Sequence, residues 1–479
     1  MIRQFLMAIC TGLTLGAFAD SETTRSILFI NEDWYGHENS TVNILYPDKA
    51  DDTCWEYRVI QEANPGKELG CTNQYGSIFN GRLYLIAKQE KDPGADITGG
   101  RITVADAETL KIITQIQQID PSGAQCDGRA FLGINQRKGY VSSSNGIWAL
   151  NLETLEIEGQ VNGSANPNAG QGNDRPPSDP TGSLYLGQSG TMVMAEGKVF
   201  AVHQQYGLLV IDPETDAVTD ILDMEWVAES ISEITGEPLA KLPGIGSTIV
   251  QSKDGFLWHS LSEDDQGLGS VLPYIVRVDP ETLERELITI NGNGDVDLYA
   301  PTNSWYAWTP DPFCASKQNN TLFWCGGSNR WFSKQLIFRF DIDNRELSVF
   351  SDLRDDPGNW NVYGCSMGID PETDEIYASL FHEFQDPTYI VRRFAPDGES
   401  LKDYSMISHY WFPSLPLFTT TKNPSGIEIS VTENSDSGDI YSLTGVRVAK
   451  DVQFGNWTNI TPGIYIYRTS KAATKIHIK

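Results

Sequence analysis

The chain has 479 residues, with 35 Lys and Arg against 64 Asp and Glu, so its formal net charge is −29. Hydrophobic residues make up 40% and charged residues 21%, a globular composition that excludes collagen-like, coiled-coil and disordered chains. The acidity argues against nucleic acid and anionic membranes as partners, because phosphate groups are bound by clustered Lys and Arg. The 43 Gly, 24 Pro and 19 Tyr indicate many turns and aromatic strands, so we expect an all-β protein.

The first 19 residues have the pattern of an export signal. Arg3 gives a positive start, residues 5–15 form an apolar run too short to span a bilayer, and 17–19 read Ala-Phe-Ala, a cleavage-site pattern. We therefore expect the mature chain to begin at Asp20; a buried N-terminal helix is the alternative. Later in the chain no stretch approaches 18 uncharged apolar residues, so no transmembrane segment is expected.

Six of the seven cysteines lie beyond this leader, and an even number in an exported chain permits disulfides. Cys314 and Cys325 flank an expected hairpin and are the first candidates for a bridge; Cys54 and Cys71 are the second. Buried free thiols are the favoured interpretation of the other two. The sequence contains no C-x-x-C motif and no zinc-like Cys/His spacing, so no metal or other cofactor is predicted.

A repeat runs through residues 27–418. Each unit reads as strand, turn, strand, loop, then a third strand that ends in Asp-Pro-Glu-Thr or a variant, followed by a fourth strand. The clearest endings are at 211–215 and 278–282, with related ones at 104–109 and 150–154. Asp accepts hydrogen bonds in such a turn and Pro presets φ, so the chain reverses between the outer strands. Units of about 45–65 residues are typical of four-stranded propeller blades.

Six full units are expected, with three strands left over at the start of the repeat and one at its end. The six units are 72–119, 127–161, 184–222, 246–290, 304–350 and 362–406. Residues 27–61 and 409–417 then supply three strands and one strand of a seventh blade, which closes the ring and removes its open edges. The sequence thus predicts a seven-bladed β-propeller over residues 20–418. An array of β-sandwiches, the rival, explains neither the recurring turn nor the orphan strands.

Residues 419–426 read as a linker, and 427–479 as a separate small β domain. Five strands are expected in this tail: 427–431, 439–442, 447–448, 463–467 and 475–478. A C-terminal extension of the propeller is the alternative.

The strand order predicts which face binds a ligand. One face collects the loops between second and third strands together with the connections between blades, and these loops are long and aromatic; the other face has tight turns. The candidate ligand-binding residues on the loop-rich face are Trp34, Tyr35, His37, Tyr75, Arg129, Gln204, Tyr206, Trp331 and Phe384. Such amphipathic groups suit a large polar ligand with apolar faces, such as a glycan or a cobalamin. Packing between blades is the competing interpretation of any one ring.

Motifs for catalysis are lacking. The sequence contains no H-E-x-x-H, G-x-S-x-G, P-loop or dinucleotide-binding motif. The polar run 291–297 suggests a calcium loop, but its twelfth position is Thr302 instead of Glu, so a plain turn is favoured. No catalytic residue is therefore predicted.

Several stretches resemble a known family, among them ILFINEDWYGHENSTVNIL, GGRITVADAETLK and YWFPSLPLF. They are similar to secreted seven-bladed propellers of Bacteroidetes, related to YVTN-type propellers and to surface propellers that capture vitamin B12 for an outer-membrane transporter. The tail, with DIYSLTGVRV and PGIYIYR, resembles the C-terminal sorting domains of type IX secretion.

The resemblance implies an exported protein with a binding role at the cell surface. The absence of catalytic motifs favours a non-enzymatic binder of a nutrient, cobalamin or a glycan, over an enzyme, and an outer-membrane transporter is the expected partner. Two other functions stay open: a propeller-type lyase, lactonase or hydrolase that uses His and carboxylates on the rim, and a surface-layer or protein-interaction component.

Overall fold

A computed structural model describes most of the chain, which divides into two compact units, Met1–Pro424 and Ser425–Lys479. In the first unit the described residues are 25–169, 183–262, 271–290, 312–326, 334–383 and 385–419; in the second they are 437–442, 447–453, 460, 463–468 and 473–478.

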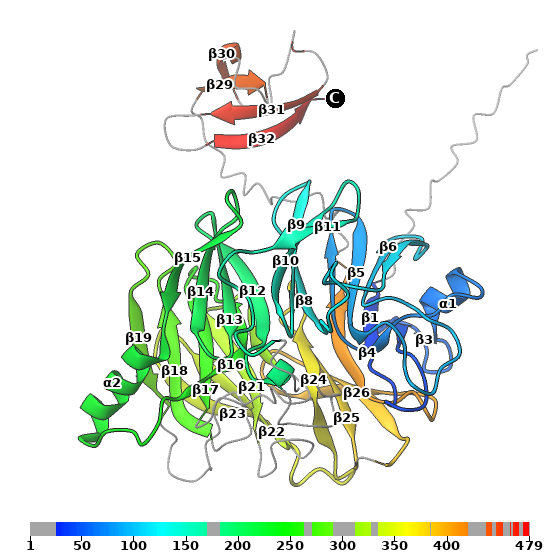
Figure 1. The fold of residues 1–479 in the computed structure, drawn as a ribbon. Helices are drawn as coiled ribbons and strands as arrows, with labels where there is room; N and C mark the ends of the chain where they lie inside the picture. Colours follow the sequence, from blue (N-terminus) through cyan, green and yellow to red (C-terminus); the bar gives the residue numbers. More distant parts are fainter. Residues whose placement is uncertain are drawn as a thin grey trace, which may run out of the picture. The chain divides into compact units, whose positions relative to one another are not determined.

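The described part of the first unit contains seven four-stranded antiparallel sheets, the blades (Figure 1). Blades 1 to 6 follow the chain, each from its inner to its outer strand. Blade 1 comprises β4 (Cys71–Phe79), β5 (Arg82–Gln89), β6 (Ile102–Asp106) and β7 (Ile112–Ile116); blade 2, β8 (Gly128–Gly133), β9 (Lys138–Ser143), β10 (Gly146–Asn151) and β11 (Ile157–Gln160); blade 3, β12 (Ser189–Ala195), β13 (Lys198–His203), β14 (Gly207–Asp212) and β15 (Ala217–Leu222).

The second half of the ring repeats this order. Blade 4 comprises β16 (Gly244–Gln251), β17 (Leu257–Ser262), β18 (Val271–Val278) and β19 (Arg285–Thr289); blade 5, β20 (Phe313–Ala315), β21 (Thr321–Gly326), β22 (Leu336–Asp341) and β23 (Glu346–Asp352); blade 6, β24 (Asn361–Ile369), β25 (Ile376–Phe381), β26 (Tyr389–Phe394) and β27 (Ser400–Ser405). Blade 7 takes its inner strand from the end of the repeat and its others from the start: β28 (Pro413–Phe418), β1 (Ile27–Asn31), β2 (Thr41–Leu45) and β3 (Trp55–Glu56).

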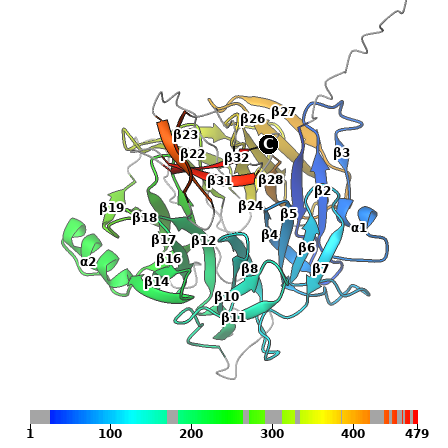
Figure 2. The same ribbon diagram turned by 90° about the horizontal axis from the view of Figure 1, so that it is seen from above.

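The inner strands form a ring (Figure 2). Each contacts the next in the order β28, β4, β8, β12, β16, β20 and β24, and β24 contacts β28 again. The predicted all-β propeller fold is confirmed. Apolar clusters fill the spaces between neighbouring blades; in one of them Tyr84 of blade 1 stacks on Phe131 of blade 2 with ring centroids 4.0 Å apart.

Strands from opposite ends of the repeat close the ring. The inner strand β28 pairs with β1 in antiparallel register, with Ile27 opposite Phe418 and Leu28 opposite Leu417. The predicted pairing of the last strand with the first is therefore confirmed. Phe29, at the centre of β1, is fully buried and meets Trp55 edge to face at 5.5 Å, so the closure also completes an apolar core.

The recurring Asp-containing turns join third and fourth strands, as the sequence predicts. Asp106, Asp212 and Asp279 each accept hydrogen bonds from backbone N–H groups two or three residues further on. These bonds stabilise the charged carboxylates and lower their pKa. These short turns lie at one end of the propeller. The antiparallel strand order therefore places the loops between second and third strands, together with the connections between blades, at the opposite end.

Among the described residues, two helices and one 3-10 turn lie in connections between blades. Helix α1 (Val59–Ala63) follows β3, the 3-10 turn η1 (Ser183–Tyr185) precedes β12, and α2 (Met224–Thr235) follows β15. Asp223 directly precedes α2, and its side chain accepts a hydrogen bond from Trp226 N at the N-terminus of the helix.

The described residues of the second unit form one four-stranded sheet in the order β30-β29-β31-β32. Its strands are β29 (Ser437–Ser442), β30 (Arg447–Gln453), β31 (Gly463–Arg468) and β32 (Ala473–Ile478). Four of the five strands expected in the tail coincide with these; the strand expected at 427–431 lies outside the described residues.

The predicted disulfides need correction, because all six described cysteines have free thiols: Cys54, Cys71, Cys126, Cys314, Cys325 and Cys365. Cys314 faces Phe323 across the hairpin, not Cys325, so the pairing register separates the two cysteines. Cys54 lies where β3 begins and Cys71 where β4 begins, which are opposite ends of the propeller. Both predicted bridges are wrong for this structure.

Candidate binding site at the loop-rich end of the axis

The strand order brings polar side chains from several blades to one end of the axis. Inner strands begin, and second strands end, at the face that carries the long loops, which we call the loop-rich end. Inner strands line the axis of a propeller. Nine residues at these strand ends form what we call the axial cluster: Glu32, Gln74, Lys88, Asp127, Arg129, Tyr185, Gln188, Gln204 and Tyr363.

Irregular pairing turns three of these side chains out of their sheets. Gln74 is the extra residue where the pairing of β4 with β5 shifts between Asn73 and Tyr75. Arg129 holds the same place in β8, and Tyr363 lies within a longer shift in β24. A β-bulge interrupts the alternation of side chains and re-aims the extra residue, a device common beside functional sites. The shifts thus explain why large polar side chains emerge from otherwise apolar inner strands.

Arg129 is the centre of one half of the axial cluster and is only 1% exposed. Its Nε and Nη2 donate to Gln188 Oε1 at 2.9 and 2.6 Å, and its Nη1 donates to Gly128 O at 3.1 Å. Its Nη2 lies 3.7 Å from Asp127 Oδ2, which also accepts a hydrogen bond from Tyr185 Oη at 3.0 Å. The guanidinium is therefore held rigidly, and its charge is matched by a buried carboxylate.

Gln188 connects this half to blade 3. Its backbone carbonyl accepts from Gln204 N at 2.9 Å, and its backbone N–H donates to Gln204 Oε1 at 3.3 Å. Blades 2 and 3 are thus joined at the axis by a continuous set of hydrogen bonds.

Glu32 is the centre of the other half. Its carboxylate accepts hydrogen bonds from Gln74 Nε2 at 2.7 Å and from the Tyr363 hydroxyl, so it links blades 7, 1 and 6. Burial lowers the pKa of Lys88 to about 8, although the nearby carboxylates of Glu32 and Asp127 oppose the shift. Two carboxylates and two cations therefore lie at this end of the axis, and all but the half-buried Glu32 are shielded from water, where electrostatic interactions are strong.

The structure separates the predicted ligand-binding residues into groups. Arg129 and Gln204 belong to the axial cluster. Tyr75 packs between blades, where burial raises its pKa to about 12 and its hydroxyl donates to Phe131 O at 3.1 Å. Tyr206 stacks on the buried His203 with ring centroids 4.2 Å apart, so packing is the better interpretation of both tyrosines.

Trp34, Tyr35 and His37 share the loop between β1 and β2. Trp34 packs on Trp411 and on His37 with ring centroids 4.5 Å apart in each case. Tyr35 is 42% exposed. Partial burial is the main cause of the raised pKa of its phenol, and the carboxylates of Asp92 and Asp127 raise this pKa further. Tyr35 thus lies at the surface beside the axial cluster. Trp331 and Phe384 lie outside the described residues.

Sequence reasoning missed Glu32, Lys88, Asp127, Gln188 and Tyr363. Their common signal is position: each lies at the start of an expected inner strand or the end of an expected second strand. The aromatic side chain of Tyr75 made it a predicted ligand-binding residue, although the neighbouring Gln74 is the one that reaches the axial cluster. The bulge that decides between them leaves no mark in the sequence.

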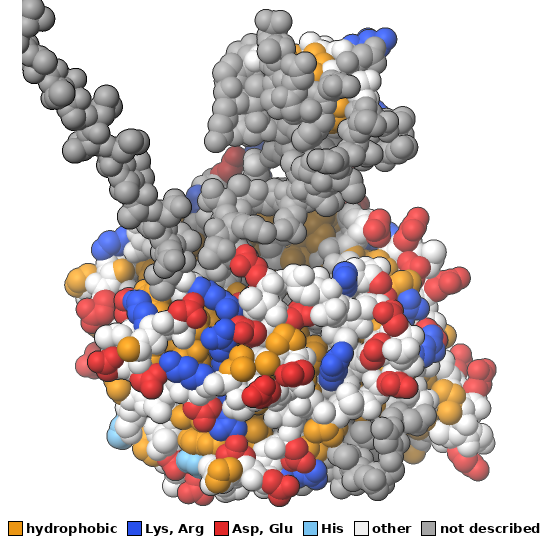
Figure 3. Space-filling model, turned by 180° about the vertical axis from the view of Figure 1, so that it is seen from behind, with side chains coloured by type: hydrophobic (Ala, Val, Ile, Leu, Met, Phe, Trp, Pro, Cys, Tyr) orange, Lys and Arg blue, Asp and Glu red, His pale blue; other side chains and the backbone are white. Residues whose placement is uncertain are grey.

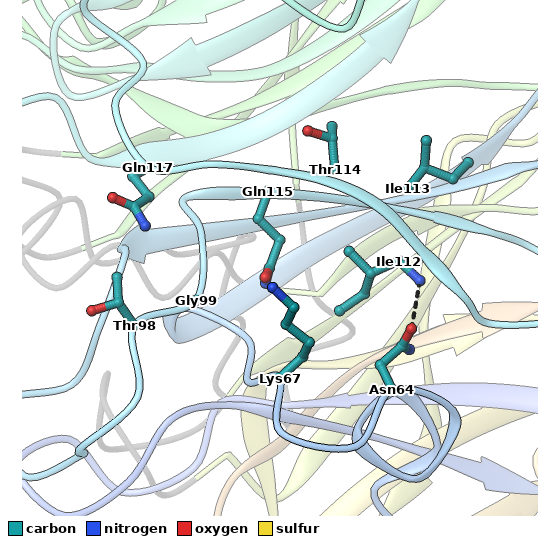
Figure 4. Close-up of a pocket in the computed structure, with 9 residues that line it drawn as sticks. All are labelled: Asn64, Lys67, Thr98, Gly99, Ile112, Ile113, Thr114, Gln115 and Gln117. Atoms are coloured by element: carbon teal, nitrogen blue, oxygen red, sulfur yellow. Dashed lines mark hydrogen bonds between the residues drawn. The ribbon is translucent and has the colours of Figure 1, made fainter.

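A separate pocket of about 340 Å³ lies on the flank of blade 1 (Figure 4). Its lining is mostly polar and comes from the β3–β4 connection, the β5–β6 loop and the outer strand β7. Asn64 is fixed there because its Oδ1 accepts from Ile112 N at 2.9 Å and its Nδ2 donates to Leu110 O at 2.8 Å. Lys67 is exposed beside it. The pocket lies away from the axial cluster and shares no residue with it.

Among the described residues, no group of three or more His, Cys, Asp or Glu side chains is arranged to hold a metal ion. None of the described helices has the length and apolar character needed to cross a membrane. On the face drawn in Figure 3, acidic, basic and apolar side chains are interspersed, so that face shows no large basic surface.

Comparisons with known proteins give a family and distant structural similarities. A family model described as "Domain of unknown function (DUF5074)" matches residues 25–419. A chain of "Crystal Structure of Mitotic Checkpoint Complex" aligns with 11% identity and a TM-score of 0.41, over 70% of this chain and 76% of that one. The "Myceliophteria_thermophila Cps50 (Swd1) beta-propeller domain" aligns with 11% identity and a TM-score of 0.40, over 72% and 87%. No curated protein matches.

Proposed function

The chain belongs to the DUF5074 family, and we propose that it is an exported propeller that binds a ligand at the loop-rich end of its axis. The axial cluster is the observation that carries the proposal. It consists of two hydrogen-bonded groups of mostly buried polar side chains, one from blades 6, 7 and 1 and the other from blades 2 and 3, yet burying charges costs stability that apolar residues would not cost. Such a cluster is more readily explained by recognition than by folding.

The proposed ligand is a nutrient of the size of cobalamin or a glycan. Tyr35 offers a half-exposed aromatic ring at the mouth of the cluster, and amide, hydroxyl and guanidinium groups lie behind it. Sites for such ligands combine apolar rings with a few well-placed polar groups. An outer-membrane transporter is the proposed partner that receives the ligand.

Export and sorting complete the proposal. The leader 1–19 directs secretion, and the second unit acts as a sorting domain of the type IX kind, with no part in binding. The separate compactness of residues 425–479 supports an independent role. Deletion of 427–479 should leave ligand affinity unchanged while fractionated cells lose the protein from their surface; normal surface delivery contradicts this part.

A ligand screen tests the binding function. Purified full-length protein is screened by thermal shift against cyanocobalamin and defined oligosaccharides, and each hit is titrated by calorimetry. Tyr35→Ala should weaken binding, because a partly exposed ring at a true site contributes on the order of 2 kcal/mol. Tyr46→Ala is the matched control, since Tyr46 follows β2 at the opposite end of the propeller. Absence of any hit, or equal effects of the two variants, contradicts the proposal.

An enzyme remains the second candidate because of Lys88. A buried amine whose pKa is lowered to about 8 is partly neutral near physiological pH and is a suitable general base. Turnover of any hit, lost in Lys88→Met, would favour the enzyme over the pure binder.

A further inference from the structure

One carboxylate oxygen of Asp127 accepts a hydrogen bond from a side chain, and the other accepts none from any residue that the structure describes. Asp127 is fully buried, and its Oδ2 accepts from Tyr185 and faces Arg129. Its Oδ1 is buried as well, and among the described residues it has no hydrogen-bond donor. Buried acceptors in folded proteins almost always have a partner, so this atom calls for a donor from outside the chain.

Buried hydroxyls in blades 3 and 4 share this feature. Ser189 begins the inner strand β12, and Ser247 and Thr248 lie in the pairing shift of the inner strand β16. Within the described part of the chain, the hydroxyl oxygens of all three are buried without a hydrogen-bond partner. Since the inner strands surround the axis, the missing partners belong to a molecule with several hydroxyl-type groups, or to water.

The charges of the axial cluster limit the net charge that a bound ligand can carry. The axial cluster holds two carboxylates, of Glu32 and Asp127, against the cations of Lys88 and Arg129. A ligand with a net charge would leave one buried charge uncompensated, which is costly in a site shielded from water. A second buried lysine at this end, Lys334, has the thiol of Cys365 as its titratable neighbour.

From these observations we infer that the site takes a neutral, polyhydroxylated ligand, such as the end of an uncharged glycan, with one ligand hydroxyl donating to Asp127 Oδ1. This inference rests on the proposed binding function and narrows it. A hydroxyl group donates and accepts at once, so it can donate to the Asp127 carboxylate while accepting from a neighbouring cation. A corrin ring offers no comparable set of vicinal hydroxyls.

A printed array of defined neutral and acidic glycans tests the inference, with fluorescently labelled full-length protein and with cyanocobalamin titrated in parallel. We expect retention by neutral glycans. Asp127→Asn replaces the open acceptor with an amide of the same shape and should raise the dissociation constant about tenfold or more, the range for a hydrogen bond to a charged group. Circular dichroism and the melting curve establish that the variant is folded. The flank variant Lys67→Ala is the control and should leave the dissociation constant unchanged, because Lys67 lies outside the axial cluster.

The outcomes distinguish the inference from the function on which it rests. Binding only of acidic glycans or of cyanocobalamin, or equal affinity of the wild type and Asp127→Asn for a neutral glycan, overturns the inference but keeps a binding function. Absence of binding to every probe overturns both proposals and assigns the buried polar atoms to internal water.

Discussion

The pair formed by Asp127 and Arg129 should show strong energetic coupling. At the observed 3.7 Å, two unit charges interact by about 4 kcal/mol at an effective dielectric constant of about 20. Arg129→Met removes this attraction together with two hydrogen bonds to Gln188, and it leaves Asp127 buried without its cation. Loss of one partner of a buried pair costs about 3–5 kcal/mol, so we expect that decrease in the free energy of unfolding.

A double-mutant cycle measures the coupling. Asp127→Asn keeps the shape and a hydrogen-bond acceptor for Tyr185, so its cost should be smaller, about 1–3 kcal/mol. In the double variant neither charge is left alone, and the combined loss should fall short of the sum of the single losses by about 2 kcal/mol. Urea denaturation at constant pH, followed by tryptophan fluorescence, gives all four free energies. A coupling below about 0.5 kcal/mol would refute the view that these charges stabilise each other.

Three further predictions concern stability and redox state. Lys88 binds a proton less readily in the folded protein, where its pKa is about 8 against an ordinary 10.5, so the free energy of unfolding rises with pH between those values. The free energy of unfolding of the wild type relative to Lys88→Met should therefore increase by up to about 3 kcal/mol from pH 7 to 10.5. A difference that does not change with pH contradicts the burial of the amine. A chain ending at residue 408 lacks β28 and should melt far below a control chain ending at residue 424, because the ring is open; equal melting temperatures would show that closure is unnecessary. Alkylation of the denatured, unreduced protein lacking residues 1–19 should modify six thiols, as expected from the free cysteines, and modification of only two or four would restore a disulfide.

The fold could be predicted from the sequence because the features that define it lie within short segments of the chain. An Asp-containing turn between third and fourth strands repeats along the chain, and the leftover strands at 27–61 and 409–417 predict that the ring closes through a blade shared by both segments. Both depend on turn chemistry and on the number of strands, which sequence patterns retain. The disulfide prediction failed because it depended on pairing register: one hairpin places Cys314 opposite Phe323 and thereby separates it from Cys325.

The candidate site was readable only in outline. Strand order correctly identified the end that carries the long loops, and Arg129 and Gln204 were found there. The choice between neighbours such as Gln74 and Tyr75 depends on a bulge, which reverses the alternation of side chains by one residue. Contacts such as those of Glu32 with Gln74 and Tyr363 arise from blades that are adjacent in space, and no spacing within the sequence encodes them.

A crystal structure of the protein soaked with whichever oligosaccharide it retains tests the location and chemistry of the site most directly. We predict ligand density at the loop-rich end of the axis, with a hydroxyl oxygen within hydrogen-bond distance of Asp127 Oδ1. Ligand density confined to the flank pocket beside Asn64 and Lys67 would contradict the axial site.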